Sequence, residues 1–413
     1  MERLKIGLVG IGGFGQVLLK YIFKLQDEGR LDLSAVCDIH PETFPSVMEG
    51  KIPGMIRTHS NYDRFLKIER QLDAIMIATP IPLHVEMGIK AMEAGYNVML
   101  EKPPALTLQD MDRMIDMRKR TGKVFAIGFQ HTSEKSFVRF SELILSGMIG
   151  EIKTICVAGL WKRTRGYFTR SEWVGKLLLN GNYVLDGTIN NPFSHLLMNC
   201  LILAGLQDQQ DVSPKWIQAE LYHANDIESE DTSCLRAKMD NGIEILYWAS
   251  ICGQDNDTPF IMVEGTRGKA SWDYDGRISH WDSEGQLQSE LTVKSDRRYD
   301  HLVNFTDFLA GRTDRLSCPL EATRKFVLTA NLAFESAGRT RSIDEVFTEK
   351  RNGQGQSVDQ LKHVDDFLCI QNIGSIMKTA VKSKRLFSEM GVEWATGTEP
   401  FHAAGYREFK LFQ

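Results

Sequence analysis

The feature that most constrains the fold of this chain is a glycine pattern near its start. Gly10, Gly12 and Gly15 spell G-x-G-x-x-G directly after the apolar run Ile6–Val9. In the segment that follows the glycines, five residues fall on one apolar helical face: Val17, Leu18, Tyr21, Ile22 and Leu25. A strand, a glycine turn and a helix in this order predict a dinucleotide-binding unit, because Gly12 lets a pyrophosphate approach the backbone. A glycine-rich turn in another α/β fold is the alternative.

The first third of the chain repeats the alternation of strand and helix. Four further apolar runs are Leu33–Cys37, Ala74–Ala78, Val98–Leu100 and Val124–Ile127. Helical patterns at Leu83–Ala94 and Leu108–Arg120 lie between them and stop near glycines. Apolar strands that alternate with helices predict a doubly wound parallel sheet covered on both faces. We assign residues 1–130 to this Rossmann domain.

The pattern changes after Gly128, where longer segments alternate apolar and polar residues. Six such segments are Glu151–Leu160, Trp216–Tyr222, Ser233–Met239, Ile243–Ala249, Phe260–Glu264 and Lys269–Asp273. The turn Asp240-Asn241-Gly242 between two of them is a hairpin signal. Together they predict an α+β domain, residues 131–345, with a large and mostly antiparallel sheet.

Helices are predicted on either side of these strands. Three fall in the second domain, at Glu134–Leu145, Tyr299–Ala310 and Glu321–Ala337. Residues 346–413 are predicted to form a C-terminal helical extension and a tail, with a helix at Val358–Lys382. The tail carries aromatic and polar residues, Trp394 and Glu399 to His402, and we expect it to pack against the surface.

Composition excludes several classes of function. The net charge of −5 argues against a general binder of nucleic acid or of acidic membranes. The seven cysteines form no C-x-x-C pair, so they predict neither a metal site nor a disulfide framework. Without a leader pattern or a run of membrane-spanning length, we expect a cytoplasmic protein.

Residues at the ends of the first-domain strands are candidates for binding and chemistry. Asp38 follows the second predicted strand, where a carboxylate binds a ribose 2′-hydroxyl and repels a 2′-phosphate, which favours NAD over NADP. A plain strand-end cap is the alternative. Lys102 follows a later strand at the same sheet edge, where an ammonium could stabilise a developing alkoxide. A solvated surface lysine is the alternative.

At this point the sequence resembles the glucose–fructose oxidoreductase / inositol dehydrogenase / MocA family. The resemblance rests on the glycine turn, on A-T-P-x-x-x-H from Ala78 to His84, on E-K-P from Glu101 to Pro103 and on Gly128-Phe129-Gln130, and it covers about residues 4–345. It implies an open-faced sheet in the second domain, often used to form dimers or tetramers. It also implies NAD(P) and hydride transfer at a hydroxyl-bearing carbon of a sugar or cyclitol. The cofactor residues that it implies are Gly10, Gly12, Gly13, Phe14, Gly15, Asp38, Thr79, Pro80, His84, Glu101, Lys102, Pro103 and Gln130.

The second catalytic segment of this family places a histidine four residues after an aspartate. Asp186 matches the aspartate, but Asn190 stands where the histidine is expected. An amide has no useful proton affinity near neutral pH, so Asn190 can bind a hydroxyl but cannot act as a base. Three interpretations stay open: His195 replaces the base, Lys102 with Asp186 carries the proton transfer, or the reaction is not a simple alcohol oxidation. A satisfied helix histidine is the alternative for His195.

A segment rich in aromatic residues and arginines follows the first strand of the second domain. Aromatic faces and guanidinium groups suit a sugar ring with polar or acidic groups, whereas a solvated loop or an oligomer contact is the alternative. With the two asparagines, the substrate-binding candidates are Arg163, Arg165, Tyr167, Trp173, Asn190 and Asn191.

Three functions are compatible with these residues. The first is an NAD-dependent oxidoreductase acting on a sugar, cyclitol or sugar-acid alcohol. The second is a glycosidase or lyase that retains NAD and oxidises the sugar transiently. The third is a non-enzymatic sugar-sensing protein on the same scaffold, because fold does not fix function.

Overall fold

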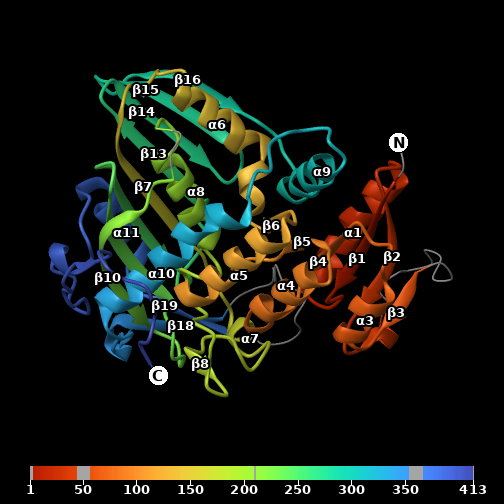
Figure 1. The fold of residues 1–413 in the computed structure, drawn as a ribbon. Coiled ribbons are helices and arrows are strands. Elements are labelled where there is room, and N and C mark those ends of the chain that lie inside the picture. Colours follow the sequence, from red (N-terminus) through yellow and green to blue (C-terminus); the bar gives the residue numbers. More distant parts are fainter. Residues whose placement is uncertain (1–2, 44–55, 209–210, 353–365, 413) are drawn as a thin grey trace. The chain divides into compact units, whose positions relative to one another are not determined.

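A computed structural model describes residues 3–43, 56–208, 211–352 and 366–412 (Figure 1). The described residues form two compact units. Unit 1 lies within Met1–Ala105, Gln109–Lys135 and Ser295–Arg324, and unit 2 within Leu106–Leu108, Ser136–Lys294 and Lys325–Gln413. The segment 295–324 therefore lies in unit 1, although the sequence placed it in the second domain. Likewise, the described part of 346–413 lies in unit 2 instead of forming a separate extension.

Unit 1 is built on a parallel sheet of six strands, in the order β3-β2-β1-β4-β5-β6. The strands are β1 Leu4–Val9, β2 Leu31–Cys37, β3 Arg57–His59, β4 Ala74–Ile77, β5 Asn97–Leu100 and β6 Phe125–Ile127. The helices of this unit are α1 Phe14–Asp27, α3 Tyr62–Ile68, α4 His84–Glu93, α5 Leu108–Thr121 and α9 Arg297–Leu309. The predicted Rossmann architecture is confirmed. Sequence analysis missed β3, because Arg57-Thr58-His59 is short and polar.

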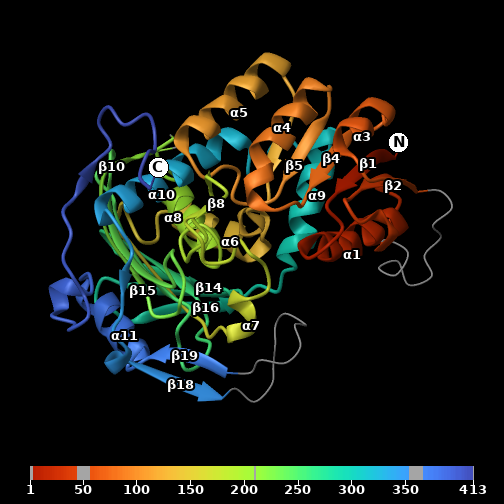
Figure 2. The same ribbon diagram turned by 90° about the horizontal axis from the view of Figure 1, so that it is seen from below.

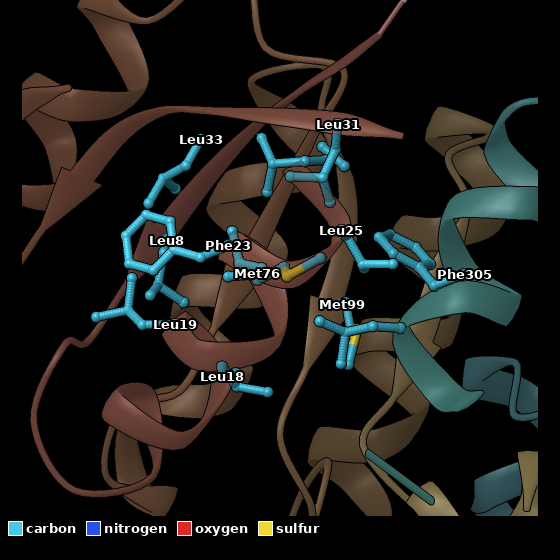
Figure 3. Close-up of a cluster of buried hydrophobic side chains, with 14 of the residues drawn as sticks. Leu8, Leu18, Leu19, Phe23, Leu25, Leu31, Leu33, Met76, Met99 and Phe305 are labelled. Atoms are coloured by element: carbon cyan, nitrogen blue, oxygen red, sulfur yellow. The ribbon is translucent and has the colours of Figure 1, made fainter. Parts of the chain in front are cut away.

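The core on one side of this sheet joins distant parts of the chain. Leu18 and Leu25 of α1 pack with Leu8 and Met76 of the sheet (Figure 3). Leu302 and Phe305 of α9 complete the same cluster, although almost 170 residues separate α9 from β6 along the chain. This cluster holds α9 beside α1.

Unit 2 is built on a mixed sheet of ten strands, mostly antiparallel. Its order is β16-β15-β14-β13-β7-β12-β11-β10-β17, with β20 also paired to β10. The strands are β7 Ile152–Leu160, β10 Pro214–His223, β11 Thr232–Met239, β12 Glu244–Ser250, β13 Phe260–Gly265, β14 Gly268–Asp273, β15 Arg277–Asp282, β16 Leu287–Thr292, β17 Arg341–Ser342 and β20 Phe401–His402. The six strands predicted for this domain are confirmed, and Asp240-Asn241-Gly242 joins the antiparallel pair β11 and β12.

Helices and two short hairpins complete unit 2. The helices are α6 Lys135–Leu145, α7 Arg165–Phe168, α8 Ser194–Ala204, α10 Arg324–Ala337 and α11 Ile373–Ser383. The hairpins pair β8 Leu178–Leu179 with β9 Asn182–Tyr183, and β18 Thr348–Asn352 with β19 Asp366–Ile370.

The C-terminal part of the chain differs from its prediction. A single helix was expected over Val358–Lys382, but its first eight residues lie outside the described part of the chain. The next five form the strand β19, in which Phe367 and Cys369 turn inward, and the helix begins only at Ile373. Asn372, just before that helix, has a left-handed backbone (φ 59°), which separates strand from helix.

The large sheet is covered on both faces over its central strands. Side chains on one face of β7, among them Ala158 and Leu160, pack in a cluster with Ile373 and Met377 of α11. On the opposite face of β7, a side chain at Gly159 would overlap Phe193, which precedes α8. The expectation of an open-faced sheet is therefore wrong for these strands, because the chain's own C-terminal segment supplies the apolar cover.

The described tail also packs on this sheet. Trp394 contacts the ring of Tyr222 on β10, at 5.1 Å between centroids, and the ring of Phe387 at 5.3 Å. Phe401 and His402 pair with β10 as β20. The expectation that the tail packs against the surface is confirmed.

Candidate functional site

The glycine turn of unit 1 has the geometry of an anion cradle. Gly10 has φ 83°, and a side chain there would meet the Ala78 carbonyl oxygen at 2.6 Å. A side chain at Gly15 would overlap the Gly10 carbonyl. Added Cβ atoms at Gly12 and Gly13, by contrast, would meet no described atom within 4 Å. Gly10 and Gly15 thus serve the fold, whereas Gly12 and Gly13 leave room for a ligand.

The N-terminus of α1 borders the same free space beside Gly12 and Gly13. Its capping residue is Gly13, which offers no side-chain cap, and the first turn, from Phe14 onward, contains no acidic residue. Backbone N–H groups at a helix start carry partial positive charge and bind anions such as pyrophosphate. The residues present therefore fit the phosphates of a dinucleotide.

Asp38 lies at the end of β2 and holds the glycine turn. One carboxylate oxygen accepts a hydrogen bond from the Ile11 N–H at 2.8 Å, and the other accepts from the His40 N–H at 2.9 Å. The strand-end cap considered for Asp38 is thus part of its role. Each oxygen keeps a second lone pair, so the carboxylate can still accept from a ribose hydroxyl.

Strand ends bring the other cofactor candidates to this edge of the sheet. The backbone N–H groups of Ala78, Glu101 and Gly128 donate to the last residues of the neighbouring strands β1, β4 and β5. Thr79 and Pro80 follow β4, Lys102 and Pro103 follow β5, and Gln130 follows β6. The predicted cofactor residues of unit 1 therefore share the carboxyl edge, where open α/β sheets bind ligands.

His84 joins two of these strand ends instead of facing outward. The ring nitrogens contact the carbonyl oxygens of Pro103 at 2.8 Å and Thr79 at 2.9 Å. Burial lowers the pKa of His84, and the charge of Lys102 lowers it further, although the two carbonyls raise it. The contacts make His84 a positioning residue for the A-T-P and E-K-P segments.

Glu101 is buried beneath the half-buried Lys102. Burial raises the pKa of the Glu101 carboxyl to about 7, although the Lys102 charge, the Lys102 N–H, the Gln130 side chain and the charge of Arg298 all act to lower it. A side chain at Gly128 would meet this carboxylate at 2.8 Å, so the glycine makes room for it. One carboxylate oxygen, Oε1, has no hydrogen-bond partner among the described residues.

Unit 2 carries Asp186, the other half of the predicted catalytic set. One carboxylate oxygen accepts from the Gly175 N–H at 2.8 Å, and the other accepts from the Asn191 side-chain amide at 2.8 Å. The side chain is 4% exposed. Leu185, just before it, adopts the left-handed region (φ 44°), and the Asn190 amide donates to the Leu185 carbonyl at 3.1 Å. Asn190 therefore supports the turn that presents Asp186.

His195 is the second residue of α8 and is half-buried. Asn191 lies in the turn before this helix, where its carbonyl accepts from the Ser194 hydroxyl at 2.9 Å. Asn191 therefore precedes the helix that carries His195. Asp186 and Asn191 are brought together directly.

The basic aromatic segment forms a stack of alternating rings and guanidinium groups. Arg163 lies 4.7 Å from the ring centroid of Trp161 and 5.2 Å from that of Tyr167. Arg170 lies 3.6 Å from the Tyr167 centroid and 5.4 Å from that of Trp173. Arg165 is exposed at the start of α7. Guanidinium groups thus cover the faces of these aromatic rings. The segment therefore offers a cationic surface instead of uncovered rings for stacking.

This stack is electrostatically linked to Asp186. Burial raises the pKa of Tyr167, and the charge of Asp186 raises it further, whereas Arg170 and Arg163 lower it. Three predicted substrate residues, Arg163, Tyr167 and Trp173, therefore lie in one array, and the charge of Asp186 acts on Tyr167 within it.

Sequence analysis missed Glu230, which lies beneath the Asp186 turn. It is fully buried and accepts hydrogen bonds from the Ile189 N–H at 3.0 Å and the Ser229 hydroxyl at 2.7 Å. A side chain at Gly187 would overlap its carboxylate. Burial raises the pKa of Glu230 to about 7, and the charge of Asp186 raises it too. The only signal in the sequence was Gly187, next to Asp186, because a glycine there leaves space for a close neighbour.

Among the described residues, no three or more His, Cys, Asp or Glu side chains gather as a metal-ligand set. No described helix combines the length and hydropathy needed to cross a bilayer.

Comparison with known proteins bears on unit 1 most directly. Residues 4–129 match the profile of an oxidoreductase family with an NAD-binding Rossmann fold. An uncharacterised oxidoreductase of Rhizobium meliloti is 30% identical over 136 residues, which are 33% of this chain and 38% of that protein. D-glucoside 3-dehydrogenase of Escherichia coli is 26% identical over 197 residues, 45% of this chain and 53% of the relative. The matches thus span from about two-fifths to half the length of these relatives.

Similarity in fold extends further along the chain. The WlbA dehydrogenase from Bordetella pertussis, solved in complex with NADH and UDP-GlcNAcA, aligns with a TM-score of 0.65 at 20% identity. The alignment covers 81% of this chain and 96% of that one. At this identity the likeness shows a shared fold: a Rossmann unit followed by a large, mixed sheet.

Proposed function

We propose, on the premise that residues 4–129 belong to the oxidoreductase family with an NAD-binding Rossmann fold, that this chain is an NAD-dependent oxidoreductase. Its substrate in this proposal is a sugar, cyclitol or sugar-acid alcohol. The observation that carries the proposal is the carboxyl edge of the unit 1 sheet, where the glycine cradle, Asp38 and Glu101-Lys102 meet. Relatives named as sugar and inositol dehydrogenases support the substrate class.

The residues divide the chemistry in the following way. Bound NAD would accept a hydride from the hydroxyl-bearing carbon. The Lys102 ammonium donates a hydrogen bond to the reacting oxygen and stabilises the alkoxide as the hydroxyl proton leaves. Asp186, fixed by Gly175 and Asn191, orients the substrate hydroxyls. His195 is the candidate acceptor of the proton, and Lys102 with Asp186 is the alternative.

Preference for NAD over NADP is also part of the proposal. The Asp38 carboxylate accepts hydrogen bonds from two backbone N–H groups, and these bonds fix it at the end of β2. A fixed negative charge there favours a ribose hydroxyl and repels a 2′-phosphate. Thermal shifts with each nucleotide test this, since a larger stabilisation by NADP would refute it.

A second candidate is a glycosidase or lyase that retains NAD. The observation that favours it concerns Asn190. This residue is 1% exposed, and its side-chain amide donates a hydrogen bond to the Leu185 carbonyl. In this candidate, Asn190 stands where the resemblance places the base, and a reaction other than net alcohol oxidation would permit that replacement. A sugar-sensing protein is the third candidate.

One experiment separates the three functions. The protein is incubated with NAD and a panel of sugars, cyclitols, uronates and glycosides, and both NADH and carbohydrate products are measured. Steady NADH formation supports the oxidoreductase, whereas product without net NADH supports the second candidate. Lys102→Ala should abolish either activity. Lys90→Ala, which removes an exposed lysine paired with Asp63, is the matched control and should leave it unchanged. A K102A variant with full activity would refute both enzyme functions.

A further inference from the structure

The helix α9 is fastened to α1, the helix that carries the glycine turn (Figure 2). Tyr299, in the first turn of α9, donates its hydroxyl to Glu28 at 2.7 Å, and its ring lies under Lys24 at 3.8 Å. Both of these partners lie near the C-terminal end of α1. Leu302 and Phe305 are buried in the shared core. These contacts therefore fix the first turn of α9 against α1.

Arg298, the neighbour of Tyr299, lies instead at the N-terminal end of α1. Its guanidinium carbon is 5.9 Å from the ring centroid of Phe14, the residue that follows Gly13 in the glycine turn. Its positive charge also acts on the Glu101 carboxyl at the end of β5. The guanidinium is thus near both cofactor segments of the unit 1 sheet edge.

The hydrogen-bonding capacity of Arg298 is not used up within unit 1. Its Nε is buried and has no hydrogen-bond partner among the described residues. No described carboxylate forms an ion pair with it either: the ion pairs of α9 involve Asp300 and Asp307. Leaving a buried donor unpaired costs free energy, so such a group indicates a missing acceptor.

An anion is the acceptor that this surrounding favours. Gly12 and Gly13 leave space above the start of α1, and no acidic residue occupies its first turn. The planar guanidinium binds two phosphate oxygens at once. We propose that Arg298 is a cofactor-binding residue whose guanidinium pairs with the pyrophosphate of the dinucleotide. This inference rests on the proposed function, because it presumes that unit 1 binds NAD.

Binding measurements test the inference without reference to turnover. NADH and ADP-ribose, which both contain the pyrophosphate, and adenosine, which contains no phosphate, are titrated into the full-length protein. In Arg298→Met we expect the Kd for NADH and ADP-ribose to rise about 10- to 100-fold. Adenosine binding should not change. The loss of NADH affinity with added KCl should become shallower in R298M, because one phosphate contact is gone.

Two further variants act as controls. Arg298→Lys keeps the positive charge but loses the planar guanidinium that binds two phosphate oxygens. It should therefore bind NADH more tightly than R298M and more weakly than the wild type. Arg30→Met removes a guanidinium from the far end of the same helix pair, where it bonds Asp307 at 2.8 Å, and should bind NADH as the wild type does. Should R298M fail to fold by circular dichroism, Arg298→Gln carries the same expectation.

The possible failures are distinguishable. Unchanged NADH affinity in a folded R298M or R298Q would overturn the role of Arg298 and leave the proposed function intact. An equal loss of adenosine affinity would also overturn it, since the residue would then act through the structure. A wild-type protein that binds neither NADH nor ADP-ribose would instead refute the proposed function itself.

Discussion

The Asn191 side-chain amide donates a hydrogen bond to one carboxylate oxygen of Asp186, at 2.8 Å. The other oxygen is held by the Gly175 N–H, so the carboxylate is fixed on both sides. Asn191→Asp would replace this donor by a second carboxylate, so Asp186 would be held on one side and repelled on the other. We expect kcat/KM to fall in this variant, because Asp186 would no longer be fixed in the orientation that contacts the substrate hydroxyls. Asn191→Ser serves as the control, because it shortens the side chain without adding charge.

Glu230 should make stability depend on pH. Its folded pKa is raised to about 7 from an ordinary value of 4.5, so the protonated carboxyl is favoured in the folded state. The stability that this contributes is fully present below pH 4.5 and is lost as pH rises through 7. Glu230→Gln removes this dependence. The Tm difference, variant minus wild type, should therefore grow from pH 5 to pH 8, with a free-energy span on the order of 3 kcal/mol. A constant difference would contradict a raised pKa.

Two glycines of the turn should separate binding from folding. A side chain at Gly12 meets no described atom within 4 Å, so Gly12→Ala should keep the Tm of the nucleotide-free protein and weaken NADH binding. A side chain at Gly15 overlaps the Gly10 carbonyl, so Gly15→Ala should lose about 1–3 kcal/mol of stability or more. Thermal denaturation without nucleotide and an NADH titration are the two measurements. Equal effects of the two variants on Tm would argue against this division of roles.

The C-terminal cover should contribute strongly to the stability of unit 2. Phe387 is fully buried in the cluster that joins α11 to the large sheet. Phe387→Ala should cost about 3–5 kcal/mol, measured by chemical denaturation. Leu287→Ala, at an exposed position on β16, is the matched control and should change stability little. A small loss in F387A would mean that the cover is weakly held.

The same cover bears on whether copies of the protein associate through the large sheet. The resemblance to the oxidoreductase family led us to expect dimers or tetramers formed through an open sheet face. That face is occupied over β7 by α11, so we expect no association through this part of the sheet. Light scattering coupled to size-exclusion chromatography measures the mass. A dimer that Phe387→Ala converts to monomer would contradict this expectation.

Most of unit 1 could be predicted from sequence, because its signals are local. The glycine turn lies between a buried strand and a helix with one apolar face, and both elements form where expected. The strand β3 could not be predicted, because Arg57 to His59 gain their place by pairing with β2 and not by burial. The membership of α9 in unit 1 was equally hidden, since a helical pattern does not reveal which sheet it will cover.

The candidate site could be predicted only where a motif carried it. Asp186 and Lys102 lie in recognisable segments, whereas Glu230 and Arg298 are single charged residues far from any motif. Their roles depend on burial and on neighbours from other elements, such as Ile189 for Glu230 and Phe14 for Arg298. The sequence does not encode such long-range contacts as a visible pattern.

The cover of the large sheet has a consequence for synthesis on the ribosome. Strands β7 and β10 to β13 leave the ribosome more than 100 residues before α11, which begins at Ile373. Until then Tyr222 and Trp248, both fully buried in the finished protein, have no cover on this face. Exposed apolar sheet surface promotes aggregation of partly folded chains. The yield of folded protein should therefore depend on how soon the last forty residues follow, and chaperones that bind nascent chains should raise it.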